Sequence, residues 1–306
     1  MHSQPPSRTR RTILRATALA VAVAAVASGC ASDTVQRGYL PGYDDGEVTD
    51  QTARITSLWN GSWIAALIVG VITWGLMLWC IAAYRKRKDD HVLPVQTRYH
   101  LPLEIMYTAV PILMVLVLFV YTDRDMGAIL DKSAEPDHTV QVVGKQWSWD
   151  FNYVDEDVYE SGEQVADVAD TLTEDAAIDG APGTSEELPT LYLPVDETVQ
   201  FELESRDVIH SFWIPAFLFK MDMIPHRTNT FQVTPTREGV YAGKCAELCG
   251  EHHSGMLFNV KVVDRAEYDA QMEALRAKGQ DGQLPVEGYS RQQDPQPAAA
   301  TTEGEH

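Results

Sequence analysis

The side chains best suited to chemistry gather in one short stretch, residues 245–256, which reads C-A-E-L-C-G-E-H-H-S-G-M. Two thiols, an imidazole at His253 and a thioether at Met256 fall within these twelve residues. Thiolate and thioether sulfur select soft metal ions such as Cu(I), and imidazole suits copper and zinc. One further ligand is expected from elsewhere, and His210 is the candidate because it directly follows a predicted strand.

The number of thiols decides between two kinds of copper site. A mononuclear blue-copper site uses one Cys, two His and a weak axial Met. Here one copper would leave a thiolate spare, whereas two coppers bridged by both sulfurs would use the full set. Three alternatives stay open: a disulfide between Cys245 and Cys249, a zinc site, for which Met is a poor ligand, and the redox dithiol of a membrane-tethered copper chaperone.

The overall composition limits the classes of function. A chain of 306 residues has room for one or two domains, and its formal net charge of −20 argues against a nucleic-acid partner, which needs a basic surface. Four cysteines are too few for a disulfide scaffold. Cys80, within an apolar run, is interpreted as a small apolar filler.

Two apolar stretches have the length of membrane-spanning helices. Residues 64–83 carry no charge over 20 positions, which as a helix spans ~30 Å, about the hydrocarbon thickness of a bilayer. The basic residues 85–88 follow at once and predict that this end is cytoplasmic. A second run, residues 105–121, is interrupted only by Pro111, which a membrane helix tolerates.

Together these stretches predict a transmembrane hairpin over residues 57–123, with helices at about 63–84 and 103–122. The length and the flanking charges argue against a buried hairpin in a soluble core. The chain after Thr122 should therefore lie outside the cytoplasm.

Residues 1–29 have the composition of an export signal: arginines without any acidic residue, then an apolar run, then small side chains. The stretch A-S-G-C that ends at Cys30 resembles a bacterial lipobox, which implies that Cys30 becomes the lipidated first residue. An uncleaved anchor, or a signal cut nearby, is the alternative. We expect residues 30–56 to form an extracytoplasmic segment.

Residues 135–265 have the pattern of a β-rich outer domain. Apolar and polar residues alternate over 147–153 and 199–204, the period of a strand. Short strands between Pro, Gly and charged turns favour an antiparallel sandwich or barrel. Further strands are expected at residues 228–233, 239–242 and 257–263.

An insertion, residues 155–187, separates the first two strands and holds 12 acidic residues but no Lys or Arg. We expect it to be solvated and mostly irregular. It is either a passive loop or an acidic arm that meets a basic partner.

The C-terminal part, residues 266–306, predicts a short helix and a disordered tail. Asp264 and Glu267 have the spacing of a capping box, and Gly279 would end the helix. The tail from Gly282 is rich in Gln, Pro and Ala and has no periodicity. One apolar stripe is expected along the helix, at Tyr268, Met272 and Leu275.

The pattern C-x-E-x-C-x3-H-x2-M, with D-x-x-H-S-F upstream, resembles the dinuclear CuA centre of subunit II of a bacterial aa3-type cytochrome c oxidase. The resemblance covers about residues 56–154 and 190–265. It implies a cupredoxin-like Greek-key barrel carried on a two-helix membrane hairpin. It also implies two copper ions, bridged by the thiolates of Cys245 and Cys249.

The resemblance implies a role for each remaining ligand. His210 and His253 would each bind one copper, with Met256 and the backbone carbonyl of Glu247 as weak ligands. The side chain of Glu247 would reach a Mg²⁺ site shared with subunit I. The spacing of His252 does not match a ligand, so we interpret it as a neighbour of the site or a surface residue.

Other positions carry implied roles with plainer alternatives. Trp147, in G-K-Q-W-S-W, would receive the electron from cytochrome c, or else it faces the core with the other alternating aromatics. Ser148 departs from the aromatic usual in the family. Glu104 would lie at the mouth of a proton pathway, or it simply contacts water at a helix end. Residues expected to contact subunit I, or to support the metal site, are Asp207, Lys220, Asp222 and Arg227.

The implied function is electron transfer in the respiratory chain, within a proton-translocating enzyme that reduces O₂ to water. This chain alone should not reduce O₂. The implied partners are subunits I and III, the lipid of the bacterial inner membrane, and cytochrome c or a membrane-tethered cytochrome c domain, as in a supercomplex with a bc complex. The acidic insertion favours a tethered donor.

Two other families remain as alternatives. A quinol oxidase subunit II shares the lipobox, hairpin and barrel but lacks the copper ligands. A copper-delivery chaperone has a thioredoxin-like βαβ fold, one membrane helix and a Pro after its C-x3-C motif, where this chain has Gly250.

Overall fold

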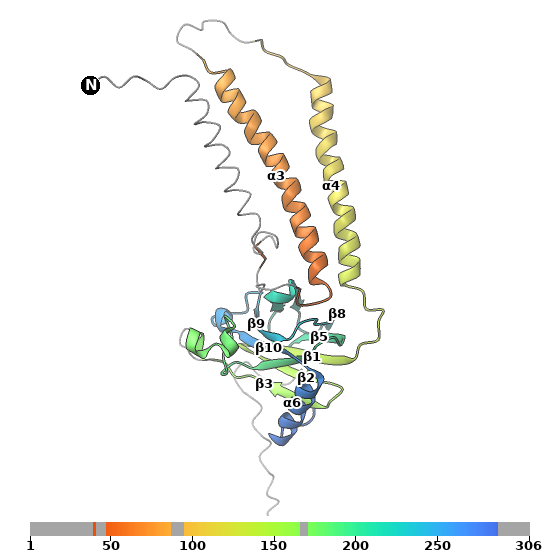
Figure 1. Ribbon diagram of the computed structural model, residues 1–306, viewed down its shortest axis with the longest axis vertical. Helices are drawn as coiled ribbons and strands as arrows, with labels where there is room; N and C mark the ends of the chain where they lie inside the picture. Colours follow the sequence, from red (N-terminus) through yellow and green to blue (C-terminus); the bar gives the residue numbers. More distant parts are fainter. Residues whose placement is uncertain (1–38, 41–46, 87–94, 166–170, 287–306) are drawn as a thin grey trace, which may run out of the picture. The chain divides into compact units, whose positions relative to one another are not determined.

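The computed structural model describes residues 39–40, 47–86, 95–165 and 171–286 (Figure 1). The chain divides into two units, one holding Thr56–Leu118 and the other holding Gly46–Ile55 and Phe119–His306. The predicted export signal and Cys30 lie outside the described residues.

Two long apolar helices form the predicted pair: α3 (Thr52–Ala83) and α4 (Leu101–Ile129). Both are long and apolar enough to cross a membrane. Pro111 lies inside α4 without ending it. The structure corrects two of the predicted bounds, because α3 begins well before residue 63 and α4 continues past residue 122.

The parts of these helices that belong to the second unit, residues 52–55 and 119–129, make polar contacts within that unit. The Thr52 hydroxyl accepts a hydrogen bond from the Val48 N–H at 3.2 Å, which ties the preceding segment to the first turn of α3. Asp125, almost fully buried, accepts hydrogen bonds from Arg124 at 2.9 Å and from Arg54 at 3.2 Å. The ends of a helix need partners from outside it, so local contacts, and not the end of the apolar run, decide where α3 begins and α4 ends.

The second unit contains two five-stranded sheets. The first has the order β3-β2-β1-β5-β8 and the second β4-β10-β9-β6-β7. The strands are β1 (His138–Lys145), β2 (Ser148–Tyr153), β3 (Val158–Ser161), β4 (Thr190–Pro194), β5 (Val199–Ser205), β6 (His210–Ile214), β7 (Phe219–Met223), β8 (Asn229–Val233), β9 (Gly239–Cys245) and β10 (Leu257–Val263).

The core between the sheets is aromatic. The Phe212 ring stacks on Phe258 with centroids 5.1 Å apart, and Trp149 meets both rings edge-on. The predicted alternation of β5 is confirmed, with Phe201 and Leu203 fully buried. Most strand pairs are antiparallel, as expected, but β1 pairs with β5, and β10 with β4, in parallel. Long crossovers between these strands allow the parallel pairing.

The acidic insertion, expected to be mostly irregular, contains short regular elements among its described residues. Its first part forms β3 against β2, and its later part contains two short 3₁₀ turns, Glu174–Ala176 and Ile178–Gly180. Its end is fixed by Asn259 of β10, whose amide accepts from the Ser185 N–H at 3.0 Å and donates to the Ser185 carbonyl at 2.7 Å. The buried amide of Asn259 therefore anchors the end of a segment that its composition predicted to be solvated.

Helix α6 (Arg265–Ala277) confirms the predicted cap and stripe. The Asp264 carboxylate accepts a hydrogen bond from the Glu267 N–H at 2.8 Å, and the chain turns at Gly279 with φ +77°. The described start of the tail is not disordered, because the Leu284 N–H donates to the Asn152 side chain at 2.9 Å. The stripe Tyr268, Met272 and Leu275 is buried.

A buried histidine joins several of these segments. The Nδ1 atom of His138 lies 2.8 Å from the Glu156 carboxylate and Nε2 lies 3.0 Å from that of Glu197. Arg265 of α6 pairs with Glu197, and the Tyr268 ring lies 5.0 Å from the imidazole. Both ring nitrogens are engaged by carboxylates, so this cluster is an ion network and offers no free imidazole nitrogen to a metal.

Candidate metal centre

Strand pairing brings the candidate ligands together. His210 begins β6 and Cys245 ends β9, and these two strands pair so that Phe212 lies opposite Cys245. The loop after β9 returns to β10 and is closed by a hydrogen bond of 3.0 Å from the Cys245 N–H to the Met256 carbonyl. The loop is thus held at both ends, by one strand pair and one backbone bond.

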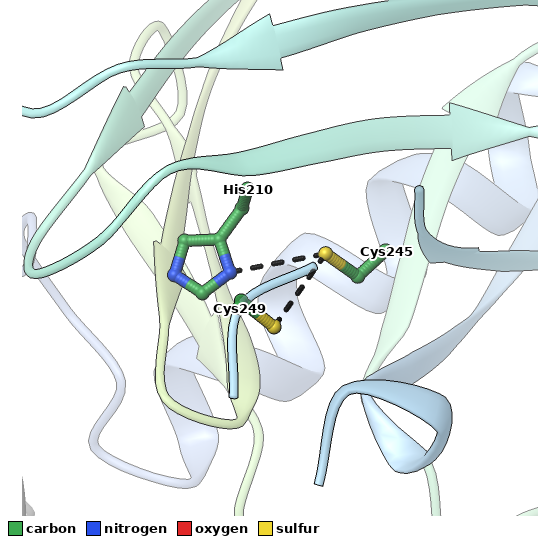
Figure 2. Close-up of side chains that lie close together, drawn as sticks. All are labelled: His210, Cys245 and Cys249. Atoms are coloured by element: carbon green, nitrogen blue, oxygen red, sulfur yellow. Dashed lines mark hydrogen bonds between the residues drawn. The ribbon is translucent and has the colours of Figure 1, made fainter. Parts of the chain in front are cut away.

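The two thiols lie next to each other beneath His210 (Figure 2). The Sγ atoms of Cys245 and Cys249 are 3.8 Å apart, and Cys245 Sγ is 3.8 Å from Nδ1 of His210. A disulfide needs sulfurs about 2.05 Å apart. Both cysteines are free and buried, so the disulfide alternative does not hold.

Each thiol lies beside a different imidazole and beside a different candidate weak metal ligand. Cys249 Sγ lies 3.5 Å from Nδ1 of His253 and 3.7 Å from Sδ of Met256. Cys245 Sγ, beside His210, lies 3.2 Å from the Glu247 carbonyl. The set therefore consists of two central sulfurs, and each side adds one imidazole nitrogen and one weak metal ligand. Such a set fits two soft metal ions that share the sulfurs. Because the thioether is a poor zinc ligand, zinc fits this set less well.

His210 is oriented by Asp207. Its Nε2 atom lies 2.8 Å from the Asp207 carboxylate, so the ring proton sits there and Nδ1 is left to face the thiol. Burial lowers the pKa of His210, but the hydrogen bonds to Asp207 and to the Cys245 sulfur outweigh it and raise the pKa above its ordinary value. Asp207, expected to contact subunit I or to support the metal site, therefore sets which nitrogen of His210 can bind a metal.

The two thiols differ in acidity. The hydrogen bond from the Cys249 thiol, with a further contribution from His210, lowers the pKa of Cys245 despite burial. The neighbouring Cys245 sulfur and burial raise the pKa of Cys249. The pair thus loses one proton readily and holds the other, which a metal cation between the sulfurs would displace.

The β1–β2 turn covers the second thiol. Gln146 Nε2 and Trp147 Nε1 both donate to the Cys249 carbonyl, at 2.6 and 3.2 Å. Trp147 lies just before β2 and is only partly buried, whereas Trp149, inside β2, is fully buried. Because β2 begins after Trp147, the alternation of the strand does not force its ring into the core. His252 meets the Trp147 ring edge-on at 4.8 Å.

Two glycines permit this packing. Gly250 has φ +129°, and a Cβ there would lie 3.0 Å from the Trp147 ring. A Cβ at Gly144 would lie 2.9 Å from Cδ2 of His210. Such close approach of backbone to a side chain is open only to glycine.

Comparison with known proteins gives the family. The model for "Cytochrome C oxidase subunit II, periplasmic domain" matches residues 138–263. The probable cytochrome c oxidase subunit 2 of Streptomyces avermitilis is 46% identical over 294 residues, covering 90% of this chain and 91% of that protein. The chain belongs to the cytochrome c oxidase subunit II family. Cytochrome c oxidase subunit 2 of Mycobacterium tuberculosis is 33% identical over 87% of this chain and 86% of that protein.

A solved structure of the periplasmic domain of subunit II from Bradyrhizobium japonicum is 28% identical, covers 47% of this chain and 97% of that one, and has a TM-score of 0.38. As a cytochrome c oxidase subunit II, the chain is part of a terminal oxidase complex. This membership excludes the copper-delivery chaperone. The quinol oxidase alternative is excluded because the relatives are subunits of cytochrome c oxidase and because the chain has the full set of candidate copper ligands.

Most of the remaining predicted residues have exposed side chains. Lys220 and Asp222 are exposed on β7, and Arg227 is exposed in the turn that follows. The Glu247 side chain is also exposed. Glu104 accepts a hydrogen bond of 2.8 Å from the His100 N–H in the first turn of α4, which is a capping contact. Their wider roles stay predictions.

Sequence reasoning missed two contributors. Gln146 was quoted only as part of the aromatic motif, although its amide reaches the metal loop; its place beside Trp147 was the available signal. Asp150 was counted among the polar residues of an alternating strand, yet all six residues of β2 are buried. A carboxylate between aromatic neighbours was the clue that it needed a buried cation.

Proposed function

We propose that the outer domain, residues 135–265, receives single electrons from a cytochrome c and passes them to the haem of subunit I, where O₂ is reduced to water and protons are pumped. The observation that carries this proposal is the pair of free, buried thiols, each beside a different imidazole. A mononuclear site has no use for the second thiol.

In this proposal Cys245 and Cys249 would both hold the copper ions, together with His210 and His253. Met256 and the Glu247 carbonyl are the weak ligands. When bound, two copper ions between the thiolates supply a carrier whose one-electron charge is shared over both metals. The protein would hold the ligands in fixed positions. The burial of the thiols and the pairing of β6 with β9 support this role, because both restrict movement of the ligands.

Trp147 is proposed as the residue that meets the donor. Its ring is partly open to solvent, while its ring N–H is bonded to the Cys249 carbonyl at 3.2 Å. A short covalent and hydrogen-bonded route therefore joins the surface to a bridging cysteine. His252 packs against the outer ring edge and limits its movement.

Contacts with the rest of the oxidase are proposed from exposed side chains. Glu247 would complete a Mg²⁺ site with subunit I, and its exposure on the metal loop leaves the carboxylate available. Glu104 would open a proton pathway, and subunit III completes the complex. Residues proposed to contact subunit I are Lys220, Asp222 and Arg227.

We propose that α3 and α4 cross the bacterial inner membrane, with Cys30 lipidated and the copper domain on the outer side. The donor is a soluble or a membrane-tethered cytochrome c, the latter within a supercomplex. The acidic insertion would face it, and its anchoring by Asn259 supports a fixed docking surface. Replacing Glu174 and Asp175 by glutamine and asparagine should then raise the KM for the native donor; an unchanged KM would remove this role.

The first test is copper content and the electron paramagnetic resonance spectrum of the full chain, reconstituted with copper in detergent micelles. Two coppers per chain are expected, with the hyperfine pattern of one electron shared over both nuclei. Cys249→Ser should abolish this pattern, while Cys80→Ser, a free and exposed thiol in α3, should leave it intact. One copper per wild-type chain, with a single-nucleus pattern, would refute the dinuclear site.

A further inference from the structure

A buried ionic cluster lies beside the metal site, in the first sheet. Its centre is Asp150 of β2, whose side chain is fully buried. Its Oδ1 atom lies 2.9 Å from Nζ of Lys145 and accepts a hydrogen bond of 2.7 Å from the Ser161 hydroxyl. Its Oδ2 atom lies 2.8 Å from Nη2 of Arg206. One carboxylate thus joins three strands or their ends: β1, β3 and the end of β5.

The two cations are nearly as deeply buried as the carboxylate. The Lys145 side chain is 12% exposed and that of Arg206 is 5% exposed. Arg206 also donates to the Pro285 carbonyl at 2.9 Å, so the start of the C-terminal tail closes over it. Replacing such a cluster with apolar side chains is often neutral or stabilising, so its presence is weak support for stability and invites a role in specifying geometry.

The place of both cations in the chain shows what geometry they specify. Lys145 directly precedes Gln146, which donates to the Cys249 carbonyl at 2.6 Å. Arg206 directly precedes Asp207, which fixes His210 and also accepts a hydrogen bond of 2.7 Å from the Gln146 N–H.

Backbone contacts reinforce the same two segments. The Arg206 N–H donates to the Gly144 carbonyl at 2.9 Å. The turn that carries Trp147 and the loop that carries Asp207 are therefore joined by the hydrogen bond from Gln146 to Asp207. Both segments are also joined to Asp150, through Lys145 and Arg206.

We propose that Asp150, acting through Lys145 and Arg206, is a positioning residue for electron uptake. It holds the Trp147 turn and the Asp207 loop in one fixed arrangement over the thiols. The inference rests on the proposed function, because it assigns the cluster to the same electron-accepting site.

Lys145→Met is the informative change. It removes one ion pair at the base of the turn and keeps the length and apolar stem of the side chain. Asp150 stays ion-paired with Arg206 and still accepts the hydrogen bond from the Ser161 hydroxyl. The turn then loses its fixed position while the copper ligands keep theirs. Outer contacts of this kind change a site's performance by about 10- to 100-fold.

The experiment uses the assembled oxidase and a soluble reduced cytochrome c as donor. In Lys145→Met, kcat/KM for the donor should fall about tenfold, with copper content and the paramagnetic resonance spectrum unchanged. Lys145→Arg, which restores the ion pair, should recover most of the loss. Leu275→Ala, a core change in α6 away from the turn, is the control for lost stability and should keep the wild-type kcat/KM.

The outcomes separate the two proposals. Wild-type oxidase without a dinuclear copper spectrum refutes the proposed function itself. A wild-type spectrum in all variants with equal kcat/KM refutes only the positioning role. A loss in Lys145→Met that is matched by lost copper, or by the same loss in Leu275→Ala, also refutes it, because the effect is then one of folding. Asp150→Asn should reproduce the Lys145→Met result if it folds.

Discussion

Replacing Asp207 by asparagine changes one atom at the point where the metal site is oriented. The carboxylate accepts three hydrogen bonds: at Oδ1 from the Val208 N–H at 2.6 Å and from His210 at 2.8 Å, and at Oδ2 from the Gln146 N–H at 2.7 Å. Burial alone would raise the pKa of Asp207, but these bonds, led by that of His210, lower it, so the group is ionised at neutral pH.

An amide offers a single oxygen to these three donors. If that oxygen stays with His210 and Val208, the NH₂ group of the amide faces the Gln146 N–H and leaves it without an acceptor. A buried donor left unpaired costs about 1–3 kcal/mol. The imidazole of His210 also loses a charged partner, which makes it a weaker metal ligand.

We therefore expect Asp207→Asn to weaken copper binding by about 10- to 100-fold, which corresponds to about 1.4–2.8 kcal/mol. The assay is a titration of the full chain in micelles against a copper chelator of known affinity. Asp222→Asn is the matched control, because it removes the same charge from an exposed position on β7. An affinity in Asp207→Asn equal to that of the control would refute the argument.

Three further predictions concern stability and packing. Burial lowers the pKa of His138, but its two carboxylate partners outweigh burial and raise it; the resulting stabilisation is complete below pH 6.5 and is lost as pH rises through the folded-state pKa, by at most about 1.4 kcal/mol per pH unit. Urea unfolding followed by near-UV circular dichroism should show this slope, and His138→Gln should abolish it. Gly250→Ala should displace Trp147, which fluorescence quenching would detect, whereas Gly282→Ala, also at positive φ but in open space, should not. Asn259→Ala should expose the acidic insertion to limited proteolysis; an unchanged cleavage pattern would contradict its anchoring role.

Much of the site was readable from the sequence because its ligands are local. Four of the five side-chain ligands lie within residues 245–256, so their spacing alone predicts a sulfur-rich copper site. The helices were readable for a similar reason, since a bilayer demands an unbroken apolar run of a given length. The cap of α6 depends on two residues three positions apart, and it was predicted correctly.

What the sequence could not decide depends on contacts between distant segments. The hydrogen bond of Asp207 to His210 is local, but the bond that joins Asp207 to Gln146 spans 61 positions and exists only because β1 pairs with β5. The anchoring of the acidic insertion by Asn259 spans 74 positions, and its composition gave no sign of this contact.

The burial of Asp150 shows the limit most clearly. Alternation in a strand tells which residues share a face, and it does not tell whether the second face is covered. Here that face is covered by Lys145, Arg206 and the start of the C-terminal tail, so a charge that looked solvated is buried and paired. The sequence by itself determined the candidate ligand set, the two helices and the β class. Only the tertiary structure decided how the surrounding loops are held, because that depends on which strands lie side by side.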